Sequence, residues 1–222
     1  MKIRTETVKE VFMRSWIKTH RYSLLLLYLP VYLAAFFLID DLPLQHYIIR
    51  CPIDALIPFN QYMIIPYAIW YAWFPGWLLF FLLRSKEDFI KLAAVMFSGM
   101  TIALLIYVIL PNGIDLREPI TGSDICSRAL SMLRKVDTPY GVCPSIHIST
   151  ITAIALVIKD TKLPDFTPTA KGYCVVITLL IAWSTMATKQ HSIVDVAAGA
   201  ALSVLLYAVY TKFCEGTILR RL

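Results

Sequence analysis

The sequence predicts an all-α integral membrane protein, a bundle of about six transmembrane helices. Hydrophobic residues make up 58 % of the chain, above the share in a typical soluble domain, and the mean hydropathy is +0.66. Charged residues make up only 16 %, and they cluster between long apolar stretches. A helix needs roughly 20 mostly apolar residues to cross a bilayer, so six helices fill about half of the chain. We therefore expect a single domain over residues 1–222.

Six apolar stretches supply these helices. They are Tyr22–Ile39, Tyr62–Leu83, Phe89–Leu110, Ile146–Ile158, Gly172–Thr188 and Ser192–Lys212. The fourth is short and contains His147, and the fifth carries hydroxyl side chains near its end. The segment Asp40–Gln61 holds three prolines, so we expect a loop or an interfacial segment there. The chain shows no internal repeat and no low-complexity tract.

Two segments each permit two interpretations. The second stretch is rich in aromatic residues, which indicates either anchoring at the membrane interface or contact with a lipid substrate. These residues are Tyr62, Tyr67, Trp70, Tyr71, Trp73 and Trp77. Residues 1–21 are basic, with Val8, Phe12 and Trp16 four apart on one face of a helix. This segment either lies on the membrane surface or forms an ordinary cytosolic cap.

Lysine and arginine are divided unequally between the two sides that the six helices define. Fifteen of the 21 fall on the side of both termini, and six fall on the other side. Cytoplasmic segments of membrane proteins are enriched in Lys and Arg, so we expect both termini in the cytoplasm. The protein is thus expected in the cell membrane, with residues 40–61 and 111–145 and Lys189 on the extracytoplasmic side.

The charge and the cysteines indicate no further class. Membrane topology explains the net charge of +6, and no basic face on a soluble fold indicates a nucleic-acid partner. Five cysteines without Cys-x-x-Cys spacing indicate neither a zinc site nor a full disulfide framework. Cys126 and Cys143 share the long outer loop and are a candidate disulfide. Gly199 and Ser203 fit close helix packing, between chains or within one, so the oligomeric state is left open.

Polar and ionisable residues gather on the outer side, at the ends of the weaker stretches. Six of them are Arg117, Ser145, His147, Lys189, His191 and Asp195. Ionisable residues are costly in or near a membrane, and their presence there predicts a function.

His191 and Asp195 are four residues apart, so they share one face if the sixth helix has begun there. A carboxylate at that distance accepts the Nδ1 proton, fixes the tautomer and leaves Nε2 as a nucleophile or base. Such pairs are often structural contacts. Asp195, however, lies in an apolar run, where a carboxylate without a partner is expensive.

The remaining residues suit the binding of an anion. His147 is a candidate general acid for a leaving oxygen. Arg117 and Lys189 are candidate cations, and Ser145 with the free N–H groups of the fourth helix adds donors. Together with the His–Asp pair they favour phosphoryl transfer, where catalysis is mainly positioning and charge stabilisation. The alternative is a set of ordinary loop charges.

The ordered set resembles the type 2 phosphatidic acid phosphatase (PAP2) superfamily. Its three motifs are Lys-x6-Arg-Pro, Pro-Ser-Gly-His and Ser-Arg-x5-His-x3-Asp. The matching positions are Arg117, Pro144-Ser145-Ile146-His147, and Ser184-Thr185 with His191 and Asp195. The resemblance covers the six-helix architecture and about 80 residues of motif-bearing chain.

The resemblance implies an enzyme that hydrolyses a phosphomonoester or diphosphate of a lipid, without a metal or other cofactor. His191 would attack phosphorus and become a phosphohistidine, Asp195 would orient it, and His147 would protonate the leaving alcohol. The phosphate-binding residues would be Arg117, Ser145, Ser184 and, as a substitute cation, Lys189.

Four positions depart from the motifs, and two phosphate-binding cations are missing as a result. Leu110 stands in place of the first lysine, and Glu118 separates Arg117 from its proline. Ile146 replaces the glycine of the second motif, and Thr185 replaces the arginine of the third. The pattern also resembles inositol phosphorylceramide synthases, so transfer of a phospho-head group to an alcohol acceptor is the alternative. A non-catalytic transport or lipid-binding protein is the second alternative.

Overall fold

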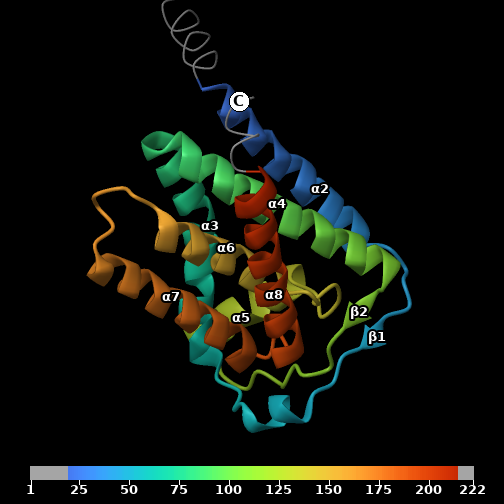
Figure 1. Ribbon diagram of the computed structural model, residues 1–222. Helices are drawn as coiled ribbons and strands as arrows, with labels where there is room; N and C mark the ends of the chain where they lie inside the picture. Colours follow the sequence, from blue (N-terminus) through green and yellow to red (C-terminus); the bar gives the residue numbers. More distant parts are fainter. Residues whose placement is uncertain (1–19, 215–222) are drawn as a thin grey trace, which may run out of the picture.

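The computed structural model describes residues 20–214, and most of this part of the chain is helical (Figure 1). In chain order the elements are η1 (Arg21–Leu27), α2 (Tyr28–Asp40), β1 (Tyr47–Ile48), η2 (Pro52–Leu56), η3 (Gln61–Met63), α3 (Ile64–Arg84), α4 (Lys86–Ile109), β2 (Asn112–Gly113), α5 (Ile125–Val136), α6 (Ile146–Asp160), α7 (Pro168–Ala187), α8 (Ile193–Val209) and the π-helical turn η4 (Tyr210–Cys214). The basic segment predicted at the N-terminus lies outside the described residues, except for His20 and Arg21.

The expected bundle of about six helices is confirmed. Five helical stretches are long and apolar enough to cross a membrane: Arg21–Asp40, Gln61–Arg84, Lys86–Ile109, Pro168–Ala187 and Ile193–Phe213. The sixth, α6, has 15 residues and is about 22 Å long, shorter than the ~30 Å hydrocarbon core. Its neighbours make up for its length, because α6 lies among α3, α4, α7 and α8 and faces protein rather than lipid.

The core is densest where α6 crosses α4 and α8. Ile151, Ile154 and Val157 of α6 are fully buried. Gly199 of α8 lies so close to α6 that a Cβ atom built there would be 2.5 Å from the carbonyl oxygen of Ser145. The small residues of α8 therefore pack within one chain, the second of the two options for Gly199 and Ser203.

Short polar residues fix where the helices begin. Ser85, Ser145, Thr167 and Ser192 each accept a hydrogen bond from a backbone N–H in the first turn of the following helix. The last of these four also forms a capping box with Asp195, in which each residue's side chain accepts from the other's backbone N–H. Because α6 and α8 both begin on one face, their first turns meet there.

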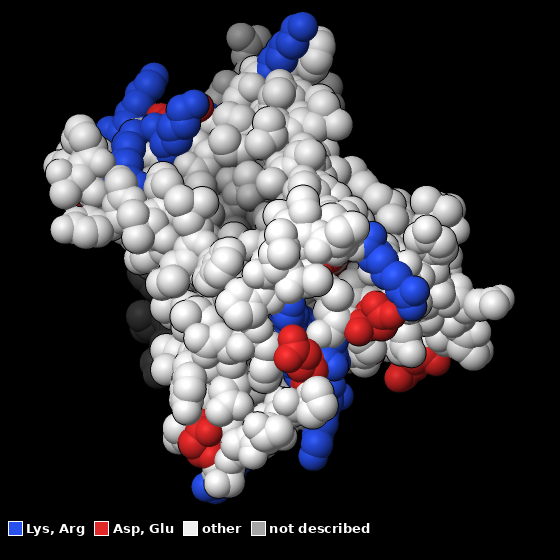
Figure 2. Space-filling model, turned by 90° about the horizontal axis from the view of Figure 1, so that it is seen from below, with Lys and Arg blue, Asp and Glu red and all other residues white. Residues whose placement is uncertain are grey.

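We call this face, formed by segments 41–63, 110–145 and 188–192, the loop side. The expectation of a loop between α2 and α3 is confirmed: it holds β1, which pairs in parallel with β2. Arg50 donates to Asp115 beside this pair, at 2.7 Å from Nη2 to Oδ2. Figure 2, seen from below, shows charged side chains in small groups on a mostly uncharged surface.

The loop side also contains a helix that the sequence analysis did not predict. Asp124 caps α5 by accepting from the N–H groups of Cys126 and Ser127. Cys126 and Leu130 pack against the first turns of α3, whereas the opposite face of α5 exposes apolar side chains. The expectation of one loop over residues 111–145 differs from the structure because α5 is amphipathic and far too short to span a bilayer.

The candidate disulfide is wrong. Cys126 and Cys143 are both free thiols in the structure. Cys126 is buried under α5, while Cys143 lies in the loop before α6, beside Asp195. Sharing one loop in the sequence does not bring the two thiols together.

Candidate active site

His191 lies in the turn between α7 and α8. Lys189 lies two residues after the end of α7, in the left-handed region at a φ of 59°, a conformation that costs a non-glycine residue about 1–2 kcal/mol. The N–H groups of Gln190 and His191 then both donate to the carbonyl of Thr185. This turn brings the imidazole of His191 under the loop side, where it is 6 % exposed.

Asp195 contacts His191, but the geometry differs from the one we expected. The Oδ2 atom of Asp195 lies 3.4 Å from Nδ1 of His191 and accepts from the N–H of Ser192 at 2.8 Å. Since α8 begins only at Ile193, the two residues do not share a helix face. The contact forms because the carboxylate turns back over the N-terminus of α8 to complete the capping box.

The start of α6 meets the same imidazole from the other side. The Nε2 atom of His191 lies 3.1 Å from Oγ of Ser145 and 3.1 Å from Nδ1 of His147. The N–H of Ser145 donates to the carbonyl of Asp195 at 3.1 Å, which joins α6 to α8 at this point. The fold thus gathers three predicted site residues around the imidazole of His191, with Ser145 and His147 at Nε2 and Asp195 at Nδ1.

Arg117 lies near this group, and backbone carbonyls occupy its guanidinium. It donates to the carbonyls of Arg134 and Asp137, while its buried Nε has no partner among the described residues. Arg134 interacts with Arg117 electrostatically and donates to the carbonyls of Glu118 and Thr188. Burial lowers the pKa of both guanidinium groups, and the charge of Asp137 opposes this effect at Arg117. We had not singled out Arg134, which carries no motif signal.

Lys189 and Ser184 make their hydrogen bonds within the protein. The ammonium of Lys189 donates to the carbonyls of Asp54 and Ile57, at 2.8 and 2.5 Å. The hydroxyl of Ser184 donates to the carbonyl of Ile181 one turn earlier in α7, at 2.6 Å. The structure thus gives both residues a packing role, and their predicted role in phosphate binding stays a prediction.

Asp54 is a second acid of the site region that we missed. It is 2 % exposed, and its carboxylate accepts from the hydroxyl of Ser192 at 2.6 Å and from the N–H of Ile193 at 2.8 Å. It therefore adds to the cap of α8 from the loop between α2 and α3. Its signal in the sequence is an acid in an otherwise apolar segment between Pro52 and Pro58.

Tyr67 and Asp137 contact the other histidine. The hydroxyl of Tyr67 lies 2.8 Å from Nε2 of His147 and donates to Oδ2 of Asp137 at 2.7 Å. The ring of Trp70 lies against the same imidazole, with 4.2 Å between the ring centroids. Tyr67 is fully buried, so part of the aromatic stretch serves the site rather than the membrane interface.

An apolar cavity of about 310 Å³ leads to the two histidines. Its walls come from α2, α3, α4 and the loop before α6; the lining includes Leu29, Phe37, Phe74, Met100, His147 and His191. Along α2 it extends from Leu29 to Phe37, which is about 12 Å of helix. A long apolar chain fits this shape with its polar end at the imidazoles.

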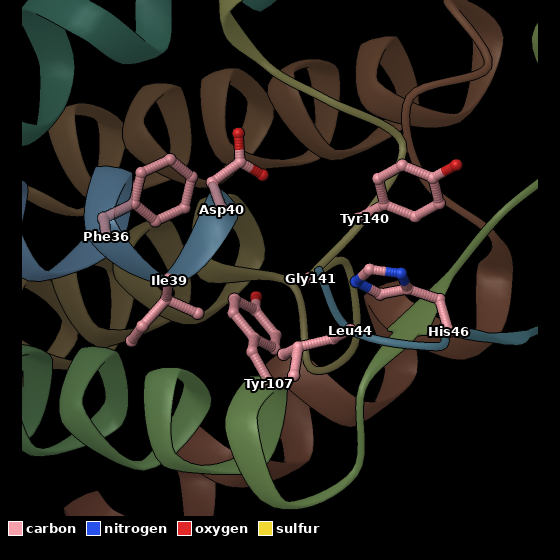
Figure 3. A pocket seen from close by; sticks show the side chains of 8 residues that line it. All are labelled: Phe36, Ile39, Asp40, Leu44, His46, Tyr107, Tyr140 and Gly141. Atoms are coloured by element: carbon pink, nitrogen blue, oxygen red, sulfur yellow. The ribbon is translucent and has the colours of Figure 1, made fainter. Parts of the chain in front are cut away.

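A small hollow of about 10 Å³ adjoins the cavity and shares Phe36, Tyr107 and Gly141 with it. Figure 3 shows the side chains that line it, with His46 and Tyr140 stacked face to face at a centroid distance of 4.1 Å. It has room for about one water molecule. The hollow is thus too small for a substrate group in this structure.

The arrangement can carry out nucleophilic chemistry. One imidazole with a carboxylate at Nδ1 presents Nε2 to a space shared with a hydroxyl and a second imidazole. That set supplies a nucleophile, a proton donor and a ligand for an oxyanion within about 3 Å of one point. Within residues 20–214, no three His, Cys, Asp or Glu side chains come together in a way that could hold a metal ion.

The comparisons with known proteins give one family match and one fold match. Residues 114–209 match the family model described as the PAP2 superfamily, a range that contains every motif residue from Arg117 to Asp195. The crystal structure of LpxE from Aquifex aeolicus has a similar fold, with a TM-score of 0.50 over 82 % of this chain and 94 % of that one. Their sequences are 17 % identical, so this likeness is one of fold. No curated protein sequence matches the chain significantly.

Proposed function

The chain carries the PAP2 superfamily pattern over residues 114–209, on a fold shared with LpxE, and from this premise we propose that it is a membrane-bound lipid phosphatase. Its substrate is a phosphomonoester or diphosphate of a lipid, and the reaction needs no metal. The observation that carries the proposal is the pair of imidazoles at the polar end of an apolar cavity, with 3.1 Å between Nδ1 of His147 and Nε2 of His191.

His191 is the nucleophile in this proposal. The Nδ1–H of His191 donates a hydrogen bond to Asp195, so Nε2 has the lone pair, which points toward Ser145 and His147. Nε2 attacks phosphorus, the bond from phosphorus to the lipid oxygen breaks, and His147 gives a proton to the departing oxygen. A water molecule then attacks phosphorus of the phosphohistidine, and His147 takes a proton from this water. The P–N bond to His191 breaks, and inorganic phosphate leaves.

Phosphate binding falls to Ser145, to the N–H groups at the start of α6 and to Arg117. The N-terminus of a helix favours an anion, because its first N–H groups are unpaired and its dipole is positive there. The buried Nε of Arg117 is one donor that the protein leaves unused. Lys189 and Ser184 reach a phosphate only if they exchange their present carbonyl partners.

The cavity supports a substrate with a long apolar chain. It extends about 12 Å along α2, into the part of the bundle that faces the hydrocarbon core. Aromatic and aliphatic side chains form nearly all of its wall, so burial of the chain supplies affinity in proportion to apolar area. We place the site at the extracytoplasmic face of the cell membrane, with both termini in the cytoplasm, because Lys and Arg are sparse on the loop side.

The test is phosphate release by the purified protein in detergent, from a panel of lipid phosphates with EDTA present. We expect release by the native protein and a loss of at least about 1,000-fold in His191→Ala, because a catalytic unit fails when its nucleophile is removed. A phosphate-labelled lipid should also give an acid-labile, base-stable label on the protein. His46→Ala is the matched control, since it removes an imidazole from the loop side outside the cavity.

Either of two results contradicts the proposal. Persistence of the label or of release in His191→Ala would exclude this residue as the nucleophile. Absence of release from every lipid, by a well-folded protein, would exclude the phosphatase and direct the search to an alcohol acceptor for head-group transfer.

A further inference from the structure

His147 has a hydrogen-bonded partner on each ring nitrogen. Its Nδ1 lies 3.1 Å from Nε2 of His191, and its Nε2 lies 2.8 Å from the hydroxyl of Tyr67. That hydroxyl lies 2.7 Å from Oδ2 of Asp137, which also accepts from the amide of Gln190 at 3.2 Å. The result is a continuous row of polar groups from α8 through α6 and α3 to the loop after α5.

Donor and acceptor capacities decide where the protons of this row lie. An ionised carboxylate only accepts, so the single hydroxyl proton of Tyr67 goes to Asp137. The phenol oxygen is then an acceptor, and Nε2 of His147 carries a proton toward it. On the other side, the Nδ1–H of His191 donates a hydrogen bond to Asp195, so Nε2 of His191 has a lone pair. The proton between the two imidazoles therefore belongs to Nδ1 of His147.

We propose that Tyr67 and Asp137 are positioning residues that hold His147 as a protonated acid aimed at the leaving oxygen. This inference rests on the proposed function. Tyr67 lies outside the matched residues 114–209, and Asp137 lies inside them but is none of the motif residues. Each histidine then has its own carboxylate, Asp195 by direct contact and Asp137 through one hydroxyl.

The proton inventory closes over one turnover. As the P–O bond breaks and the P–N bond forms, the proton on Nδ1 of His147 moves to the alcohol oxygen. The proton on Nε2 stays there, hydrogen-bonded to the oxygen of Tyr67. His147 is now neutral, with a lone pair on Nδ1. This lone pair takes a proton from the attacking water as the P–N bond breaks. The electrons of that bond become the lone pair on Nε2 of His191 again.

Burial of its imidazole disfavours the protonated state of His147, and the charge of Asp137 is the main effect that favours it. Asp137 is the nearest acid, beyond the hydroxyl of Tyr67, and Asp195 lies on the far side of His191. The guanidinium of Arg117, which interacts electrostatically with Asp137, and His191 once that ring gains a charge also oppose protonation of His147. Removing the carboxylate of Asp137 thus makes protonation of His147 harder, and the high-pH limb of kcat/KM moves to lower pH.

The experiment compares two phosphate esters whose leaving groups differ. Decyl phosphate releases an alkoxide that must be protonated, whereas p-nitrophenyl phosphate releases a stable phenolate that needs no acid. For Tyr67→Phe and Asp137→Asn we expect kcat/KM to fall by roughly 100-fold with decyl phosphate and by roughly tenfold or less with p-nitrophenyl phosphate. In both variants the high-pH limb with decyl phosphate should move down by about one unit or more.

Matched controls separate this effect from damage to the fold. Tyr28→Phe removes a phenol hydroxyl that bonds to Phe97 and Thr101 in the bundle, and Asp115→Asn removes a carboxylate of the loop side that bonds to Arg50. Neither variant should change the ratio of kcat/KM for decyl phosphate to kcat/KM for p-nitrophenyl phosphate. Thermal unfolding in detergent checks that all four variants fold.

Each outcome decides one of the two proposals. Equal losses of kcat/KM on both esters, or an unmoved high-pH limb, would overturn the proposed positioning of His147. Tyr67 and Asp137 would then be structural residues. If both esters are still cleaved by His191→Ala, or neither is cleaved by the native protein, the proposed function itself fails. A selective loss with decyl phosphate, found together with inactive His191→Ala, supports both.

Discussion

Asp195 combines structural and chemical contacts in a single residue. Its carboxylate caps α8 and faces Nδ1 of His191, and its carbonyl accepts from the N–H of Ser145. The thiol of Cys143 lies beside it as well. Burial and then the negative charge of Asp195, with a hydrogen bond to it, raise the pKa of this thiol to about 11. The Oδ2 atom of Asp195 thus joins the cap of α8 to the imidazole, whereas its buried Oδ1 has no hydrogen-bond partner among the described residues.

The pKa of Cys143 gives a direct test of that charge. Because the pKa is raised, the thiol is protonated at neutral pH, and only the thiolate reacts with alkylating agents. In a variant whose only cysteine is Cys143, we expect slow modification by iodoacetamide at pH 7–8 and a rate that rises with pH toward about 11. In the same background, Asp195→Asn should move the rise to lower pH. An unchanged profile would mean that Asp195 carries no charge beside Cys143.

Among elements, the crossing of α6 and α8 determines the geometry of the site. Ser145 and His147 are in the first turns of α6, and His191 precedes α8 by two residues, so their distances depend on how closely these helices approach. Gly199 permits that approach, since only its missing Cβ leaves room for the carbonyl of Ser145. The hydroxyl of Ser203 strengthens the crossing further along, where it donates to the carbonyl of Ser149 at 2.6 Å.

Substitution of Gly199 tests this role. A Cβ there would lie 2.5 Å from backbone, so Gly199→Ala must push the helices apart, at a cost of about 1–3 kcal/mol. We expect a lower unfolding temperature in detergent and a larger loss of phosphate release than of folded protein. Gly172→Ala is the matched control, because a Cβ at Gly172 in α7 meets nothing within 4 Å. It should leave activity unchanged and raise helix stability by about 0.5–1 kcal/mol. Equal behaviour of the two variants would contradict the argument.

At the scale of the whole molecule, one end of the bundle contains the candidate active site, and the turns at the other end only connect the helices. The turns at the far end are tied by Arg84, which donates to Asp165, and by Lys171, which donates to the carbonyls of Lys159 and Thr161. The loop side instead presents the site and the long segments that cover it. The asymmetry of Lys and Arg between these two ends predicts which one faces the cytoplasm.

Cysteine labelling of intact cells tests this orientation. In a variant without native cysteines, Ser123→Cys on the loop side should react with a membrane-impermeant maleimide. Lys162→Cys, between α6 and α7, should react only after permeabilisation, because we place that turn in the cytoplasm. Both positions are exposed, so burial does not explain a difference. The opposite pattern would reverse the proposed topology.

The membrane class, the six helical stretches and the motif residues follow from the sequence alone, because each depends on local composition or on fixed spacing. Apolar length reveals a spanning helix, and the positions of His147, His191 and Asp195 within their motifs need no fold to be recognised. The sequence could not reveal α5, whose amphipathic pattern is too short to stand out in a long loop. It also gave the wrong reason for the contact between His191 and Asp195, because the start of α8 depends on Ser192 as its cap.

Which residues from distant parts of the sequence contact the motif residues depends on the tertiary structure. Tyr67 is 80 residues from His147, and Asp54 is 138 residues from Ser192, so no local pattern links either pair. Their meeting depends on how α3 and the loop before it pack against α6 and α8. The same packing directs Lys189 to the carbonyls of Asp54 and Ile57 and leaves the apolar cavity open beside His147. Side-chain partners across a bundle follow from helix approach and rotation, and the sequence specifies these only through the packing of the whole core.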